Sequence, residues 1–206
     1  MESGVAAVVE WLRACAREFD GRVAELNDLD RILGDGDHGT NMHRGFHTAQ
    51  YVDFDRLETP SDALRHAGMA LVRVVGGASG PLFGTFLLRG GAVWPAEVTA
   101  SSMAMVVRTG LNGVEARGKA EPGDKTMIDA LAPAADALER AAAEGLGLPA
   151  ALERAATAAE LGRDRTAEMI ARRGRAALHA GQSLGILDPG AVSMALILRT
   201  AADHLA

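Results

Sequence analysis

The segment 26–42 reads LNDLDRILGDGDHGTNM and links two stretches with helical spacing. Apolar residues recur every three or four positions over residues 5–26, which predicts one long amphipathic helix. The three glycines of GDGDHG, residues 34–39, exclude a helix interior at that point. We therefore predict a loop after the first helix and a second helix that begins at Thr40 or Asn41.

Helical spacing continues through the rest of the chain, interrupted by three further glycine-rich stretches. It predicts helices at about residues 61–75, 82–90, 99–114, 126–144, 150–171 and 189–205, with Ser61 or Asp62 capping the first of these. With the first two, they make an up-and-down array of eight antiparallel helices. The loops after the first, third, fifth and seventh helices are therefore expected at one end, around Asp35, Gly77, Gly123 and Gly181.

Composition favours an all-α fold and one domain. The 206 residues are 48% hydrophobic but only 4% aromatic, and alanine, the best helix former, is abundant throughout. A chain of this length suits one core, and no linker divides it. Residues 1–206 are expected to form a single domain.

Charge and cysteine content argue against several classes of protein. The net charge is −6 and no long basic run occurs, which disfavours nucleic acid or an anionic membrane as a partner. No signal peptide and no uncharged stretch of membrane-spanning length is recognisable, so a cytoplasmic protein is expected. The single cysteine, Cys15, cannot form an internal disulfide, and its apolar neighbours predict a buried structural thiol.

Three carboxylates, those of Asp30, Asp35 and Asp37, lie within eight residues of the first loop. Hard divalent cations take oxygen ligands, and magnesium leaves coordination positions for substrate phosphates. Carboxylates crowded together without a cation repel one another, so D-x4-D-G-D-H-G favours a metal site over an acidic surface turn. An EF-hand is a poor match, because no bidentate glutamate follows at the required distance.

Several neighbouring residues suggest phosphate contacts, each with a structural alternative. His38 could cap a helix, touch a phosphate or hydrogen-bond a ligating carboxylate. Free N–H groups at the predicted helix start near Thr40 and Asn41 favour an anion. Ser79 could donate to a phosphate oxygen or merely close a turn. Asp188 precedes a proline, so capping of the last helix fully explains it.

The third and fourth loops offer positive charge. Arg117, Lys119 and Lys125 could form a charged lid over a phosphate site, or each could simply be solvated. Met127 could pack against a flat base. Arg175 could reach a phosphate.

Four segments together resemble the L subunit of dihydroxyacetone kinase and the matching C-terminal domain of single-chain dihydroxyacetone kinases. The matching segments are LNDLDRILGDGDHGTNM (26–42), GGASGPLFGT (76–85), RGKAEPGDKTMIDAL (117–131) and GRAA…LDPGA (174–191). Their order and spacing span nearly the whole chain, and the first and third are the most specific. The resemblance implies an eight-helix antiparallel up-and-down barrel with the nucleotide at one end.

The resemblance also implies a site, position by position. Asp30, Asp35 and Asp37 would hold two Mg²⁺ ions that bridge the phosphates of ADP or ATP. No residue is identified as catalytic with certainty, because positioning and charge neutralisation carry phosphoryl transfer. The positions that match nucleotide contacts are His38, Gly39, Thr40, Asn41, Ala78, Ser79, Gly118, Met127, Arg175, Asp188, Pro189 and Gly190.

The implied activity is phosphoryl transfer to a hydroxyl of a short keto sugar, with this chain contributing only the nucleotide and metals. In the family, a partner K subunit holds the sugar covalently through a histidine. In some systems a phosphotransferase M subunit rephosphorylates bound ADP in place, and in others ATP exchanges. A homodimer is left open.

One segment departs from the family pattern. Residues 178–186 read LHAGQSLGI, where the family usually shows Y-L-G-E-R-S-I-G-H. The departure motivates a second hypothesis, a nucleotide-sensing interaction module without turnover. A plain helical structural protein is a third hypothesis, which the four glycine-rich loops disfavour. The nucleotide domain of fatty-acid kinases carries a similar loop, usually DGDTG, and His38 favours the dihydroxyacetone kinase side.

Overall fold

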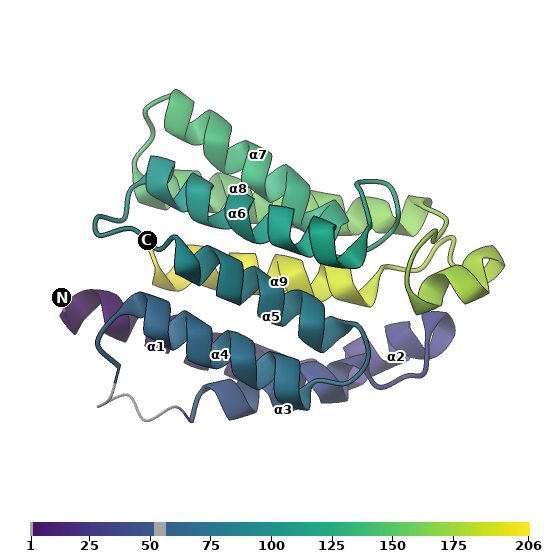
Figure 1. The fold of residues 1–206 in the computed structure, drawn as a ribbon. Coiled ribbons are helices and arrows are strands. Elements are labelled where there is room, and N and C mark those ends of the chain that lie inside the picture. Colours follow the sequence, from purple (N-terminus) through teal and green to yellow (C-terminus); the bar gives the residue numbers. More distant parts are fainter. Residues whose placement is uncertain (1, 52–56) are drawn as a thin grey trace.

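The computed structural model describes residues 2–51 and 57–206, and these residues form helices and connecting segments without a strand (Figure 1). The prediction of an all-α fold is confirmed. The elements are α1 (Glu2–Gly21), α2 (Val23–Leu33), α3 (His38–Ala49), α4 (Pro60–Val74), α5 (Ser79–Ala92), α6 (Ala100–Gly118), α7 (Ile128–Ala143), α8 (Leu148–Arg165), the 3₁₀ helices η2 (Thr166–Glu168) and η3 (Arg175–Gln182), and α9 (Pro189–His204).

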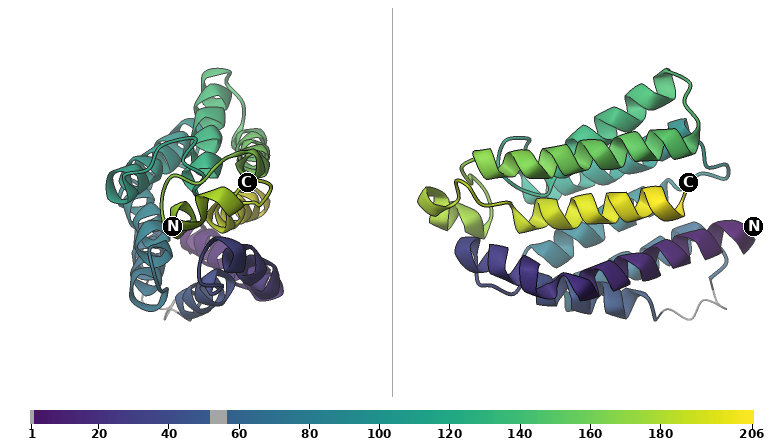
Figure 2. Two further views of the ribbon diagram at one scale, coloured as in Figure 1. Left: turned by 90° about the vertical axis from the view of Figure 1, so that its right-hand side faces the viewer. Right: turned by 180° about the vertical axis from the view of Figure 1, so that it is seen from behind.

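Long helices that follow one another in the sequence also pack against one another. The contacts run from α1 to α3 and then in order to α9, which returns to α1. The indole Nε1–H of Trp11 joins the two ends of this ring by donating to the carbonyl oxygen of Ile197 at 3.2 Å. Figure 2 shows the arrangement end-on. This order of contacts is the one that an antiparallel barrel requires, and α7 and α9 also touch.

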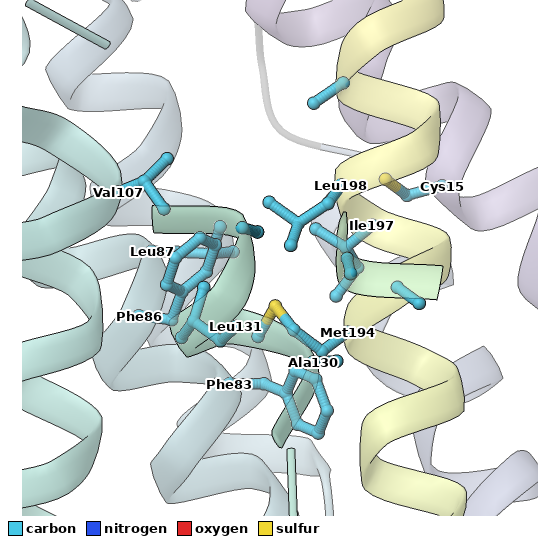
Figure 3. Close-up of a cluster of buried hydrophobic side chains, with 14 of the residues drawn as sticks. Cys15, Phe83, Phe86, Leu87, Val107, Ala130, Leu131, Met194, Ile197 and Leu198 are labelled. Carbon is cyan, nitrogen blue, oxygen red and sulfur yellow. The ribbon is translucent and has the colours of Figure 1, made fainter. Parts of the chain in front are cut away.

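One part of the core lies where side chains of α9 meet those of α5, α6 and α7 (Figure 3). Met194 and Ile197 of α9 are buried, as are Phe83 and Phe86 of α5 and Leu131 of α7. Removal of this apolar surface from water is the main stabilising contribution to such a fold. The core thus fills the middle of the bundle, and a binding site can form among the loops at an end of the bundle.

Two expectations from composition also have outcomes in the structure. Cys15 is fully buried on α1, and burial raises the pKa of its thiol far above the usual range, which confirms a structural thiol. Among residues 2–51 and 57–206, none of the helices is long and apolar enough to cross a bilayer.

The first predicted helix is wrong in its extent. The helix is interrupted at Arg22. The next helix, α2, then runs to Leu33, so Asp30 lies on a helix rather than in a loop. Leu26 and Leu33 are buried and extend the apolar face past the predicted end. The next helix begins at His38, earlier than predicted, because a side chain of α2 satisfies its first N–H groups.

Other helix boundaries also shift. Thr59 caps α4, in place of the expected Ser61 or Asp62, and its side-chain oxygen accepts from the backbone N–H of Asp62 at 3.1 Å. The fourth predicted helix starts at Ser79 rather than at residue 82. The seventh ends at Arg165 and passes into η2, short of residue 171.

Candidate functional site

A cleft of about 810 Å³, including its solvent-open part, lies at the end of the bundle where the four glycine-rich regions meet, called here the loop end. All four glycine-rich regions contribute to its lining, which includes Asp30, Asp35, Gly77, residues 125–127, 173–176 and 188–190. The predicted convergence of these loops is confirmed. The break at Arg22 does not disturb it, because α2 continues α1 toward the same end (Figure 1).

The three predicted metal ligands lie together beside this cleft. Carboxylate oxygens of Asp30, Asp35 and Asp37 are all within 4.8 Å of one another. Asp35 and Asp37 are exposed, and Asp35 forms an ion pair with Arg175. Three hard oxygen donors at this spacing fit a divalent cation such as Mg²⁺, because like charges this close repel one another without a counter-ion.

Asp30 also fixes the shape of the loop. Its Oδ2 accepts hydrogen bonds from the backbone N–H groups of Asp37 at 2.9 Å and His38 at 3.1 Å. Its Oδ1 lies against Gly34, where a Cβ atom would collide with it. Gly34 therefore permits the close approach that brings the carboxylate of α2 to the start of α3.

His38 is buried and joins three helices. Its Nδ1 lies 3.2 Å from the Oγ of Ser79 on α5, and its Nε2 lies 2.8 Å from the Oγ of Ser193 on α9. Burial lowers the pKa of His38 to about 4, although the charges of Asp30 and Asp37 act in the opposite direction. The imidazole is therefore neutral near pH 7, and it orients the hydroxyl of Ser79.

The next three residues divide between two sides of α3. Gly39 packs against α2, whose backbone a Cβ atom would strike. The N–H of Thr40 donates to Asn27 Oδ1 at 3.0 Å, and its hydroxyl accepts from Asn27 Nδ2 at 2.9 Å. Only Asn41 of the three lines the cleft. The expectation of a free N–H at Thr40 is therefore wrong, because α2 already caps this helix.

The second glycine-rich region opens more directly to the cleft. Gly77, Ala78 and Ser79 all line it. Gly77 has a φ of 63°, a left-handed conformation that glycine adopts readily, and the turn leads straight into α5. The N-cap residue, Ala78, makes no side-chain capping bond, so this helix start offers N–H groups for an anion.

The third loop is held by the carboxylate of Asp129, on α7, rather than lying open as a lid. Asp129 accepts from the backbone N–H of Gly123 at 2.6 Å and from that of Thr126 at 2.7 Å. Lys125 is only 1% exposed, so the expectation of a charged lid is wrong for this residue. Lys119 remains exposed.

A second hollow of about 700 Å³ adjoins the cleft. Gly118 lines this hollow and not the cleft, whereas Met127 and Ala78 line both. Leu82 and Ile128 give the hollow an apolar wall. The structure thus separates the predicted nucleotide residues into an acidic part and an apolar part.

The fourth region supplies two arginines and the start of α9. Arg175 lines the cleft beside Asp35, and Arg173 lies 3.4 Å from a carboxylate oxygen of Asp124. Asp188 caps α9 by accepting from the N–H of Ala191 at 2.7 Å. The turn at residues 188–190 borders the cleft as predicted.

The titration of Asp188 is expected to appear in the pH dependence of stability. Burial raises its pKa to about 7 and the nearby charge of Asp129 adds to this, while the N–H of Ala191 and the charge of Lys125 lower it. A carboxyl that binds its proton more tightly when folded stabilises the protein below its unfolded pKa, and this contribution is lost as pH rises through 7.

Asp188→Asn keeps a capping oxygen but cannot titrate. We expect the stability of the natural protein relative to this variant to fall between pH 5 and pH 8, in urea denaturation at each pH. A difference that does not change with pH would contradict the raised pKa.

Several residues shape the site through partners that the sequence does not reveal. Asn27 caps α3 from α2, and Ser193 reaches His38 across 155 positions of sequence. Asp129 and Lys125 hold loops in place by hydrogen bonds to backbone groups. Each acts through a partner that only the folded chain brings near.

Comparisons with known proteins show what the chain is similar to. The model of the DAK2 domain family matches residues 32–203. The ADP-binding subunit DhaL of the PEP-dependent dihydroxyacetone kinase of Escherichia coli (strain K12) is 40% identical over 199 residues, which cover 93% of each chain. The L-erythrulose 1-kinase of Mycolicibacterium smegmatis is 37% identical over 187 residues, 88% of this chain and 32% of that protein.

A solved structure is similar over nearly the whole chain. It is the dihydroxyacetone kinase from C. freundii in complex with AMP-PNP and Mg²⁺, with a TM-score of 0.71 and 27% sequence identity. The match covers 96% of this chain and 34% of that chain, so the present chain spans about a third of the larger enzyme.

Proposed function

The chain belongs to the DAK2 domain family, and from this premise we propose that it is the ADP- or ATP-binding subunit of a dihydroxyacetone-type kinase. The observation that carries the proposal is the cluster of Asp30, Asp35 and Asp37 beside a cleft built from four loops. In this role, residues 1–206 act as one nucleotide-binding domain. The reaction is phosphoryl transfer from the nucleotide to a hydroxyl of a short keto sugar.

The acidic end of the cleft is the proposed place of the phosphates. Asp30, Asp35 and Asp37 would hold two Mg²⁺ ions, which neutralise phosphate charge when bound. The side chain of Asp30 is kept in place by the hydrogen bonds that it accepts from the backbone N–H groups of Asp37 and His38, at the start of α3. Arg175 pairs with Asp35, and its guanidinium is available to a phosphate oxygen once the carboxylate serves a metal.

The apolar hollow is the proposed place of the nucleoside. Gly118 and Met127 line it, and a flexible thioether packs well on a flat base. Between the two parts, the contacts assigned to the phosphates come from His38, Asn41, Ala78 and Ser79, and the turn of Asp188, Pro189 and Gly190 would line the nucleotide. Gly39 and Thr40 would act indirectly, by docking α3 on α2.

The acceptor sugar requires another protein in this scheme. The Escherichia coli relative is named as a subunit of a PEP-dependent kinase. We propose a K subunit that carries the keto sugar as the partner, with a phosphotransferase M subunit where ADP stays bound. Because other relatives are named L-erythrulose kinases, dihydroxyacetone and L-erythrulose are both acceptors to be tested.

Calorimetric titration with ADP tests the nucleotide role. We expect saturable binding of one ADP in the presence of Mg²⁺ and little binding after metal removal with a chelator. The protein is first unfolded and extracted to detect nucleotide that co-purified with it. An ADP affinity that is the same with and without Mg²⁺ would refute the proposed site. So would a failure of the nucleotide-free protein to bind ADP when Mg²⁺ is present.

The sensing module without turnover is the second candidate. Leu178 is 83% exposed and Leu184 is 60% exposed, both within the segment that departs from the family pattern. Exposed leucines of this kind suit protein contact. Formation of sugar phosphate when ATP, Mg²⁺ and a K-type partner are supplied would exclude this candidate, whereas ADP binding without any turnover would support it.

A further inference from the structure

The segment 166–186 connects α8 to α9 and carries Arg175 to the cleft. It contains only the 3₁₀ helices η2 and η3 and lies at the loop end of the bundle (Figures 1 and 2). Such a segment has little regular backbone pairing of its own. Its position over the cleft must therefore be set by contacts from outside.

Lys125 supplies an unusual set of these contacts. Its Nζ donates to the carbonyl oxygens of Thr166 at 2.5 Å, Ser183 at 2.7 Å and Ile186 at 2.5 Å. An ammonium has three N–H donors, so all of them are used. Although Lys125 borders the cleft, its side chain is directed into this carbonyl cage and is 1% exposed.

The three carbonyls lie at the two ends of the segment and not at its tip. Thr166 begins the segment, whereas Ser183 and Ile186 end it. Neighbouring bonds tighten the same junction, since the N–H of Gly185 donates to Ala167 at 2.7 Å and the N–H of Asp188 donates to the Thr166 hydroxyl at 2.9 Å. Lys125 thus closes a loop whose projecting part holds Arg175.

The backbone at Lys125 is shaped for this insertion. Its φ is 62°, in the left-handed region that residues with side chains rarely adopt. Thr126 and Met127 follow immediately and line the cleft. One residue therefore connects the third loop to both ends of the fourth.

We propose that Lys125 is a positioning residue of the nucleotide site, which holds segment 166–186 in place and thereby sets Arg175 and the turn at residues 188–190. This inference rests on the proposed function for its effect on ADP, but not for its effect on the segment itself. A different role, in which the Lys125 ammonium serves only a phosphate and does not hold the segment, would leave the nucleotide-free segment unaffected by its removal.

The test compares Lys125→Met with Lys119→Met. Both lysines lie in the third loop with positive φ, 62° and 51°, but Lys119 is exposed and borders neither the cleft nor the hollow. For Lys125→Met we expect faster amide exchange across residues 166–186 and faster tryptic cleavage after Arg172 and Arg173 in the ADP-free protein. Amide exchange in α4–α6 should stay unchanged.

Binding of ADP with Mg²⁺ is measured on the same two variants. Because Lys125→Met removes a buried group that makes three hydrogen bonds, we expect its Kd for ADP to rise about tenfold or more. For Lys119→Met we expect the Kd to change by less than about twofold. Equal losses in both would identify long-range charge as the cause and overturn the proposal. Unchanged exchange of segment 166–186 in ADP-free Lys125→Met would also overturn it.

A second variant covers the case in which Lys125→Met fails to fold. The buried Ser183 hydroxyl accepts from the N–H of Ala171 at 2.9 Å and lines neither the cleft nor the hollow. Ser183→Ala should loosen the same segment and weaken ADP binding to a smaller degree, and normal ADP affinity despite a loosened segment would overturn the proposal. If the natural protein binds no ADP, the proposed function fails. The amide exchange and tryptic cleavage results would still show whether Lys125 holds segment 166–186 in place.

Discussion

Asp37→Asn is expected to weaken Mg²⁺-dependent ADP binding by about two orders of magnitude or more, since even indirect partners of metal ligands contribute 10- to 100-fold. The carboxylate of Asp37 is exposed and belongs to the cluster within 4.8 Å, and its backbone N–H, which bonds Asp30, is unaffected by the change. The loop should therefore keep its shape. Titration calorimetry with ADP and Mg²⁺ measures the loss.

The same change should slightly stabilise the protein when Mg²⁺ is absent. Removing one of three mutually repelling carboxylates relieves a cost that the cation otherwise offsets. Thermal unfolding in a chelator is expected to show a raised Tm for Asp37→Asn, and the natural protein alone should gain from added Mg²⁺ and ADP. This opposite movement of stability and binding distinguishes a metal site from a structural role.

Asp28→Asn is the matched control for Asp37→Asn. Asp28, on α2, is also exposed, it pairs with Arg31, and it is not part of the cluster. ADP affinity should be unchanged. If Asp37→Asn bound ADP as tightly as Asp28→Asn in Mg²⁺, the assignment of the cluster to a metal would be wrong.

Local patterns predicted the parts of the fold that depend on local chemistry. The Asp188-Pro189 start of α9 is predictable because a capping residue followed by proline is a sequence signal. The interruption of the helix at Arg22 is not predictable, because the apolar face continues from α1 into α2 without a proline or a run of glycines. The sequence does not favour Thr59 as the cap, because Ser61 and Asp62 are at least as good capping residues.

The residues of the site also differ in how far the sequence predicts them. The sequence predicts Asp30, Asp35 and Asp37 as one group because they lie within eight residues of a glycine-rich segment, and the structure brings them together. The part played by Lys125 could not be predicted, since its carbonyl partners lie 41 to 61 residues away and carry no side-chain signature. Backbone acceptors are present at every residue, so a lysine that binds them resembles a solvated one until the chain is folded.

Gly162→Ala is expected to cause the largest loss of stability, because α8 meets α7 here without room for a methyl group. Pro133 lies inside α7 and has no N–H, which deprives the carbonyl of Asp129 of its usual helical partner. Gly162 packs on that carbonyl, with which a Cβ atom would collide, and the Cβ would also lie 2.8 Å from Pro133 Cγ. Neither neighbour is the end of a flexible side chain, so the helices must separate.

We expect Gly162→Ala to lower the free energy of unfolding by about 3 kcal/mol, the upper part of the usual range for an overpacked core. Gly21→Ala is the control, because a Cβ atom at that helix end meets nothing within 4 Å, and its stability should change by less than about 0.5 kcal/mol. Urea denaturation measures both. Since Asp129 also holds Gly123 and Thr126 of the third loop, Gly162→Ala should weaken ADP binding as well, whereas equal stability of the two variants would show that α7 and α8 are not in this close contact.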